Sequence, residues 1–344
     1  MTAHLPKSSA ALAQWLALTP LELNWLCNAK RVEAANGHYR YRKIAKRDGT
    51  WRILAVPKSR LLRAQQKIFR EFIRPYAQPH PAAFGFVQGK SVIEHARTHV
   101  GARWLLKMDL KNFFDSIPLA RVRAQFSRMS HTSELAQALA QLCTHRMPVQ
   151  LLAPLDPFAR ATHRARQLPQ GAPTSPMLAN LVAYALDQRL TGLAAKFSLR
   201  YSRYADDLAF SPQPGAVSAS PHHVATIIER IIRAEGFVHN AAKRAIVGAK
   251  SQLSITGIVV NERVNMARKD FDLLKAKVHR YRQNLEHCPR TYAQLLGQIS
   301  WLRQLNPQKA AKLLAKLQGV EATGFPPKAR ENDELSHPRS LVTN

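Results

Sequence analysis

Acidic residues are scarce in this chain, whose 344 residues include 22 Asp and Glu against 51 Lys and Arg, a formal net charge of +29. Cysteine is scarcer still. Cys27, Cys143 and Cys288 lie far apart and form no CxxC pair, which excludes a disulfide framework or a zinc knuckle and is typical of the reducing cytosol. No apolar run approaches the ~18 residues that a membrane span needs, and the N-terminus lacks the features of a signal peptide. We therefore expect a cytoplasmic protein that does not enter a membrane.

Apolar residues make up 46% of the chain, which excludes disorder throughout and allows a core in two or three domains or subdomains. The positive charge repels itself unless a polyanion neutralises it. Nucleic acid is therefore the first candidate partner and an anionic membrane surface the second. Residues 40–74 alone hold 12 Lys and Arg against two acids. This excess is too one-sided for salt bridges along a helix to absorb, and we interpret it as a phosphate-facing surface.

The apolar pattern predicts a mixture of helices and strands. We expect two short helices within 8–30, a hairpin over 38–58, a buried strand over 104–109, and helices over 119–129 and 133–142. A stripe then predicts one amphipathic helix after the stiff loop 168–176, formed by Leu178, Leu181, Val182, Ala185 and Leu186. A hairpin over 199–211, a helix ended by Gly236, strands over 245–248 and 253–260, and helices to about residue 317 follow.

Three carboxylates stand out in so basic a chain. Asp109 ends an apolar strand, and Asp206 and Asp207 lie at a predicted hairpin tip. An acid on an apolar strand beside another acid costs desolvation and repulsion, and a divalent cation would remove both costs. Carboxylate oxygens suit Mg²⁺, and two such ions can serve phosphoryl transfer. An isolated Asp-Asp pair would more simply be a turn, so the surrounding sequence has to decide.

Four segments follow one another in the order found in reverse transcriptases. They are FGFVQGKS (84–91), KMDLKNFFDSI (107–117), LPQGAPTSP (168–176) and YADD (204–207). Over roughly residues 40–317 the chain resembles these enzymes, and more narrowly those of bacterial retrons. Ile255-Thr256-Gly257 is similar to the retron V-T-G signature. Residues 95–99 are similar to the N-A-x-x-H signature, with His95 in place of Asn.

The resemblance implies an α+β fold, a right-hand polymerase with fingers, an antiparallel-sheet palm and a helical thumb. We expect an N-terminal helical extension at 1–34, fingers at 35–103 and 120–175, and a palm at 104–119 and 176–262. The thumb would occupy 263–318. A polar, Pro-bearing tail at 319–344 is expected to be disordered.

The resemblance also implies the roles of the acids. Asp109 and Asp206 would be the main ligands of two Mg²⁺ ions, with the backbone carbonyl of Leu110 assisting and Asp207 supporting the site. Lys243 would be a general acid for the pyrophosphate leaving group, although a solvated lysine is an equal alternative.

Nucleotide contacts are implied in the same way. Arg52 and Arg63 would grip the triphosphate, because guanidinium groups bind phosphate bidentately. Gln170 and Gly171 would pack against the incoming nucleotide, and the ring of Phe114 would exclude a ribose 2′-OH. On a strand Phe113 and Phe114 cannot both face inward, which favours a surface or site position for one of them.

The implied partners are dNTPs, a cognate structured noncoding RNA with its RNA–DNA product, and a separate effector protein in anti-phage defence. Candidate RNA contacts in the thumb are Lys269, Lys275, Lys277, Arg280 and Arg282. Two alternatives stay open. One is a group II intron-like or CRISPR-associated reverse transcriptase, and the other is a noncatalytic RNA-binding scaffold of the same fold.

Overall fold

The computed structural model describes residues 6–28, 37–45, 49, 51–130, 132–152, 165–217, 219–283 and 288–319. By its internal contacts the chain forms two units. The first comprises Met1–Thr256 with Val260–Arg263, and the second Gly257–Val259 with Val264–Asn344. The disordered tail predicted for 319–344 lies, apart from Gly319, outside the described residues.

The first unit begins with helices and a hairpin. The helices are α1 (Ser9–Trp15) and α2 (Pro20–Cys27). A capping box starts α2, since the Thr19 side chain accepts from the Glu22 backbone N–H and the Glu22 carboxylate accepts from Thr19 N–H. Strands β1 (Tyr39–Ala45) and β2 (Trp51–Pro57) pair antiparallel, which confirms the hairpin predicted over 38–58.

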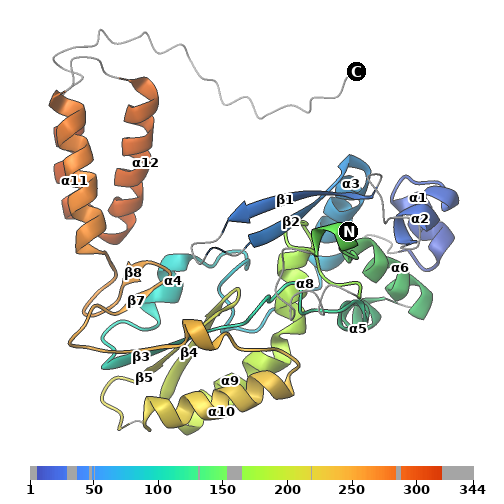
Figure 1. Cartoon of the computed structure of the whole chain (residues 1–344), viewed down its shortest axis with the longest axis horizontal. Helices are drawn as coiled ribbons and strands as arrows, with labels where there is room; N and C mark the ends of the chain where they lie inside the picture. Colours follow the sequence, from blue (N-terminus) through green and yellow to red (C-terminus); the bar gives the residue numbers. More distant parts are fainter. Residues whose placement is uncertain are drawn as a thin grey trace. The chain divides into compact units, whose positions relative to one another are not determined.

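The first unit contains further helices (Figure 1). They are α3 (Ser59–Lys67), the π-helix η2 (Ile68–Ile73), α4 (Val92–Arg97), α5 (Leu119–Met129), α6 (Ser133–Cys143) and the short 3₁₀ helix η3 (Val149–Leu151). The structure therefore confirms the helices predicted over 119–129 and 133–142.

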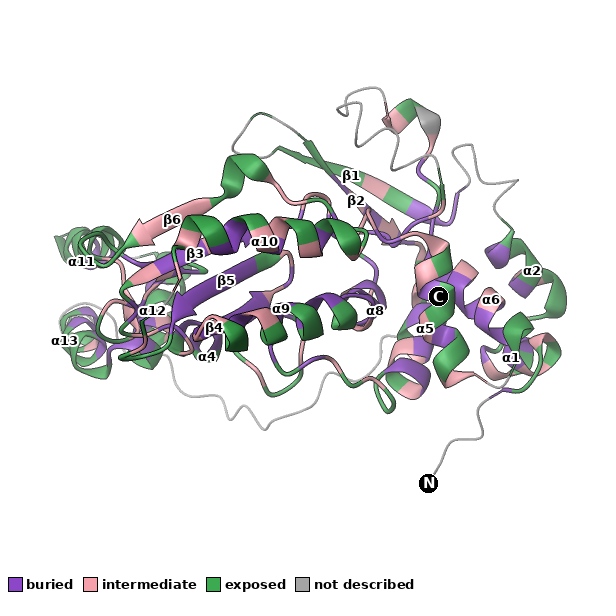
Figure 2. Cartoon of the chain, turned by 90° about the horizontal axis from the view of Figure 1, so that it is seen from below, coloured by how far each residue is buried: buried purple, intermediate pink, exposed green. Residues whose placement is uncertain are grey.

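A four-stranded antiparallel sheet forms the centre of the first unit. Its order is β4 (Leu199–Tyr204), β5 (Asp207–Pro212), β3 (Trp104–Asp109) and β6 (Ala245–Gly248). Helices α9 (Tyr184–Lys196) and α10 (Pro221–Ala234) cover one face of this sheet and turn their exposed sides to solvent (Figure 2). The antiparallel sheet and its helical cover confirm the expected α+β class.

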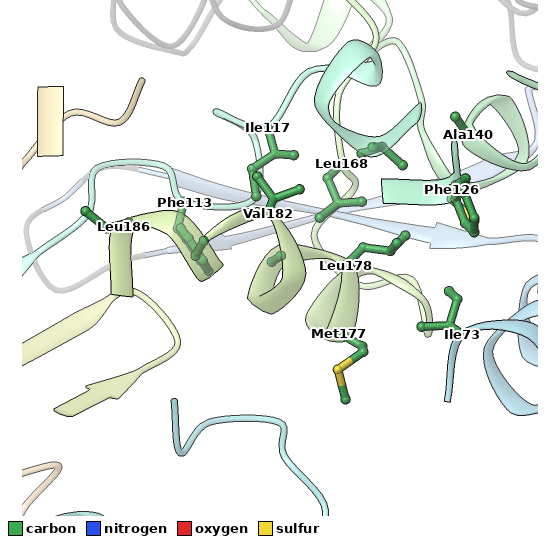
Figure 3. Close-up of a cluster of buried hydrophobic side chains, with 14 of the residues drawn as sticks. Ile73, Phe113, Ile117, Phe126, Ala140, Leu168, Met177, Leu178, Val182 and Leu186 are labelled. Atoms are coloured by element: carbon green, nitrogen blue, oxygen red, sulfur yellow. The ribbon is translucent and has the colours of Figure 1, made fainter. Parts of the chain in front are cut away.

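The hydrophobic core runs from the sheet to the helices beside the hairpin. Figure 3 shows its middle, where α8 (Ser175–Val182) meets α5 and the loop after β3 through Leu178, Phe126 and Ile117. The single amphipathic helix predicted after residue 176 is wrong in one respect. The chain forms two helices, α8 and α9, joined at Ala183, and the change of direction leaves Ala185 exposed although the predicted stripe included it.

The second unit is mainly helical. Strands β8 (Ile258–Val259) and β9 (Asn265–Met266) pair antiparallel and precede α11 (Arg268–Gln283), α12 (Pro289–Leu305) and α13 (Pro307–Gln318). The helices share a separate apolar core that includes Leu274, Val278, Ile299, Leu302 and Leu313. No helix in the described part of the chain is long and apolar enough to span a membrane.

One predicted strand is interrupted. Residues 253–260 give two short strands, β7 (Ser254–Ile255) and β8, because Thr256 and Gly257 between them have positive φ angles of 47° and 83°. A left-handed pair cannot continue an extended strand.

Candidate active site

The three acids singled out in the sequence meet at one end of the sheet. Asp109 is the last residue of β3 and pairs in register with Asp207, the first residue of β5. The backbone N–H of Leu110 donates to the carbonyl of Asp206 at 2.9 Å. Antiparallel pairing of β3 with β5 therefore joins positions that are 97 residues apart in the sequence (206 − 109).

The turn that carries Asp206 is tight. Ala205, at its first position, has a positive φ of 56° and is buried. Gly85 lies directly against it, because a Cβ atom on Gly85 would stand 2.6 Å from the Ala205 backbone nitrogen. Only a residue without a side chain allows the two backbone segments to approach this closely.

A buried ion pair supports the same turn, and sequence reasoning missed it. The guanidinium of Arg203 donates to both carboxylate oxygens of Asp187, at 2.8 and 2.6 Å, and both side chains are completely buried. Arg203 also donates to the carbonyl of Ala205 and to the amide oxygen of Asn180, each at 3.0 Å. Asn180 in turn donates to the carbonyl of Gly85 at 2.9 Å. This network joins α8, α9, β4 and the residues on both sides of the turn.

The segment that resembles the retron N-A-x-x-H signature lies behind the same hairpin. Both ring nitrogens of His99 are hydrogen-bonded, Nε2 to Ser202 Oγ at 2.7 Å and Nδ1 to Ser211 Oγ at 2.8 Å. The His95 ring lies between Phe84 and Tyr204. Burial lowers the pKa of His95 to about 4. Both histidines are packed in the interior, which agrees with a structural role.

Lys243 and Asn240 hold the carboxylate of Asp109. The ammonium of Lys243 donates to Oδ2 at 2.8 Å and the amide of Asn240 donates to Oδ1 at 3.1 Å. The Asn240 backbone N–H also donates to the Asp109 carbonyl at 2.7 Å. These partners come from the short 3₁₀ helix η4 (Ala241–Lys243) and the residue before it.

The pKa values show how closely the acids interact. Burial, and after it the charge of Asp109, raises the pKa of Asp206. Desolvation, followed by the charges of Asp206 and Asp109, raises the pKa of Asp207 to about 6. Desolvation acts to lower the pKa of Lys243, but the hydrogen bond from Lys243 to Asp109 and the charges of the acids outweigh it and raise that pKa. Burial is thus the main cause of the raised pKa values of Asp206 and Asp207, and the neighbouring carboxylates add to it.

This donor set has the chemistry of a magnesium site. Within the described ranges, however, no three carboxylate, imidazole or thiolate groups converge closely enough to hold an ion as they stand. The carboxylate of Asp109 is turned to Lys243 and Asn240. What fits a cation is that burial, and after it the neighbouring carboxylates, raises the pKa values of Asp206 and Asp207, since a bound cation would favour the ionised carboxylates.

The two phenylalanines after Asp109 take different positions. Phe113 is 3% exposed and belongs to the core in Figure 3. Phe114 is half-buried, and its ring lies 6.1 Å from the ring of Phe86, which is exposed. The chain forms turns here instead of continuing β3. The division predicted from the sequence, with one ring inside and one at the surface, agrees with these positions.

The predicted nucleotide-binding residues separate into two places. The charge of Arg52 acts on Asp206, the carbonyl of Gln170 accepts from Ala55 N–H on β2 at 2.8 Å, and Gly171 takes a φ of 116° against Ala55. Arg63 instead lines a pocket between α3 and the turn after α1. The structure thus brings Arg52 close to the acids and places Arg63 beside the N-terminal helices.

The predicted RNA-binding cations all lie on one helix of the second unit. Each of the five is exposed on α11, whose other face forms the core of that unit. They are Lys269, Lys275, Lys277, Arg280 and Arg282. Lys277 also lines a pocket of about 480 Å³ between α11 and α12, together with Gln298 and Trp301.

Comparisons with known proteins agree on one family. Residues 44–260 match the reverse transcriptase (RNA-dependent DNA polymerase) family. The retron Mx65 reverse transcriptase of Myxococcus xanthus is 35% identical over 80% of this chain and 63% of its own length. The retron Mx162 enzyme of the same organism is 32% identical over 92% of this chain and 67% of its own length.

A third relative is the retron Ec86 reverse transcriptase of Escherichia coli, which is 30% identical over 72% of this chain and 71% of its own length. The matches therefore span only about two thirds of the length of these relatives. The family match covers β2, the four-stranded sheet and all three acids. The chain belongs to the reverse transcriptase family and, within it, to the retron reverse transcriptases.

Proposed function

We propose that this protein copies a cognate structured noncoding RNA into DNA, in the cytoplasm, by attack of a primer 3′-OH on the α-phosphate of a dNTP. The observation that carries the proposal is the register of Asp109 with Asp207, which places Asp206 one backbone hydrogen bond from Leu110. Three acids at one end of the sheet, with the charge of Arg52 acting on Asp206, form a site for a phosphate that is bound and displaced.

Asp109, Asp206, Asp207 and the carbonyl of Leu110 are the groups that would hold two Mg²⁺ ions. When bound, such ions activate the attacking oxygen and stabilise the leaving one. The protein's own contribution is to hold the carboxylates in place. Pairing of β3 with β5 fixes the positions of Asp109 and Asp207, and the buried network behind Ala205 fixes that of Asp206.

The predicted contacts around this centre bind the nucleotide or assist release of the pyrophosphate. Arg52 grips the triphosphate, and Gln170 and Gly171, whose loop is tied to β2, border the nucleotide. The half-buried ring of Phe114 excludes a 2′-OH. Lys243 stays protonated beside Asp109 and can give its proton to the pyrophosphate as it leaves.

The wider setting follows from the retron relatives. The RNA would be template and scaffold, and its DNA copy would be the multicopy single-stranded DNA of a retron. The exposed cations of α11 would hold the RNA–DNA duplex by its phosphates. A separate effector protein and a role in anti-phage defence complete the proposal. Sequencing the nucleic acid that copurifies would distinguish a retron RNA from the RNA of a group II intron or CRISPR-associated enzyme.

The decisive experiment is the double substitution Asp206→Asn with Asp207→Asn. Primer extension on an RNA template with dNTPs should fall to background. A matched control, Glu134→Gln with Glu262→Gln, removes two carboxylate charges from exposed positions outside α11 and should retain extension. Extension by the first variant at the wild-type rate would contradict the assignment and leave the noncatalytic scaffold as the explanation.

A further inference from the structure

A stripe of cations runs along the continuous helix formed by α3 and η2. Its members are spaced three and four residues apart, so that they share one face of the helix. The opposite face carries Leu61, Ala64, Ile68 and Phe72, which are buried in the core. At ~1.5 Å per residue the stripe is about 20 Å long. It consists of Arg60, Arg63, Lys67, Arg70 and Arg74.

The stripe forms one wall of a pocket of about 510 Å³, which we call the α3 pocket. Four of the five cations line it, Arg74 being the exception. The facing wall is the turn between α1 and α2, which presents the apolar side chains of Leu16, Ala17 and Leu18. This volume lies within the range of sites that hold small organic groups, ~300–1,000 Å³. The pocket therefore offers an apolar wall opposite a row of cations.

The acids near the pocket do not neutralise it. Glu22 is occupied, because one of its oxygens accepts from Arg60 at 2.9 Å and the other from Thr19 N–H at 2.8 Å. Glu71 serves Arg70 at 2.9 Å and Lys67 at 3.9 Å. Four cations against these two carboxylates leave a net charge of +2. The Arg70 side chain is 66% exposed, and an exposed pair of this kind is worth little, so that a polyanion can displace it.

Arg63 is the cation that the protein leaves available. Among the described residues it has neither a hydrogen-bond acceptor nor an ion-pair partner, and it is exposed on the pocket rim. By contrast the ammonium of Lys67 is held 5.0 Å above the ring of Trp15, and Arg74 donates twice to the amide oxygen of Gln88. The stripe is therefore positioned by neighbouring contacts while its central guanidinium stays free for a ligand.

The backbone gives a second, independent indication. The helix changes from α to π geometry at Ile68, within the stripe. π-Helical turns are rare, and they occur frequently at functional sites. Here the wider turn carries Arg70 on the pocket side and Phe72 in the core.

We propose that the α3 pocket binds a single-stranded nucleic acid segment, with one unpaired base against the apolar wall and the neighbouring phosphates along the stripe. A lone nucleotide would use the pocket but not a stripe of about 20 Å. A duplex would keep its bases stacked and unable to enter. Arg63 then contacts a strand instead of the incoming triphosphate. The proposal goes beyond the polymerase reaction and does not depend on it.

The test measures binding of a labelled, unstructured 12-nucleotide RNA to the full chain, without dNTPs or divalent ions. The variant Lys67→Gln with Arg70→Gln removes two stripe charges. The control Arg230→Gln with Arg233→Gln removes two charges from the exposed face of α10. Each lost phosphate contact lowers the salt slope by ~0.7 for a single strand. Between 50 and 200 mM salt, the affinity of the wild type should therefore fall about sevenfold more than that of the stripe variant.

The control should keep the wild-type salt slope, and Arg63→Gln should weaken binding by itself. Crosslinking of an RNA that contains 4-thiouridine should label the peptide with residues 15–18, a readout that needs no variant. An oligonucleotide with abasic sugars should bind the wild type more weakly, and DNA of the same sequence shows whether the pocket prefers RNA.

Equal salt slopes in wild type and stripe variant, or crosslinks confined to other peptides, would overturn the proposal. Equal binding of the abasic strand would overturn the insertion of a base. Binding is measured without dNTPs or divalent ions, whereas the test of the polymerase reaction measures extension, so that the two tests can fail independently.

Discussion

The buried pair of Asp187 and Arg203 allows a sharp test of how the turn at Asp206 is held. Asp187→Asn keeps the size of the side chain and an acceptor for the Tyr201 hydroxyl, which donates to Oδ1 at 2.7 Å. It removes the charge opposite a guanidinium with no exposed surface. Breaking such a pair from one side costs about 3–5 kcal/mol, because the remaining charge stays buried without compensation.

A matched control lies two residues further along the same helix. Arg189 pairs with Glu235 at 2.8 Å, but its side chain is 49% exposed. Arg189→Gln should cost only about 0–1 kcal/mol, since water replaces the lost partner. Unfolding in urea followed by circular dichroism gives both values, and hydrogen exchange of the β4 and β5 amides assigns the loss to the sheet.

Activity provides a second readout of the pair. Arg203 donates to the carbonyl of Ala205, next to Asp206, so that Asp187→Asn should lower kcat for primer extension more than it raises KM for the template. The double variant Asp187→Leu with Arg203→Met should be more stable than Asp187→Asn alone, because no buried charge remains. If Asp187→Asn costs no more than Arg189→Gln, the reasoning is refuted.

Three further predictions concern the same site. Asp207→Asn should raise Tm at pH 8 when a chelator removes divalent ions, because the raised pKa of about 6 means that the ionised carboxylate destabilises the folded state. The gain in Tm should vanish as the pH falls from 6 towards 4, where the carboxylate is protonated. A gain in Tm that does not depend on pH would contradict this. Phe114→Ala should lower the preference for dNTP over rNTP, measured as the ratio of kcat/KM values, by at least about tenfold, and an unchanged ratio would remove its role as a steric gate. Gly85→Ala should slow extension, because the added Cβ would stand 2.6 Å from the backbone nitrogen of Ala205. The control Gly192→Ala, which has open space around it in α9, should leave extension unchanged and stabilise the helix by up to about 1 kcal/mol. Equal extension rates for both variants would show that the contact at Ala205 does not matter.

Local patterns were sufficient to predict the parts of the site that depend on neighbours in sequence. The apolar run before Asp109 and the short turn before Asp207 predicted the two strands, and the motif order predicted that they would pair. The break at Ala183 was not predictable in this way, because the apolar stripe continues through it and only tertiary packing selects two helices.

The buried network of Arg203, Asp187 and Asn180 could be predicted only from the polar residues of these segments and not from their apolar pattern. The polar residues Asn180 and Asp187 are buried on two successive helices, α8 and α9. Buried polar residues need partners. Arg203 on β4, whose sequence is Leu-Arg-Tyr-Ser-Arg-Tyr, was an available one. The signal was present, but the identity of the partner depends on how β4 meets the two helices.

The burial of Arg203 supports the turn beside it, which carries Asp206. After desolvation, the charge of Asp109 contributes to the raised pKa of Asp206, and the charges of Asp206 and Asp109 contribute to that of Asp207. The turn at Ala205 has to hold these acids close together in spite of this. The restraint has to come from behind the turn, and a charged guanidinium fixed on both sides by Asp187 resists displacement more strongly than an apolar contact, which has no preferred direction. The buried pair thus supports the turn that carries the acids, and weakening the pair should change the position of Asp206.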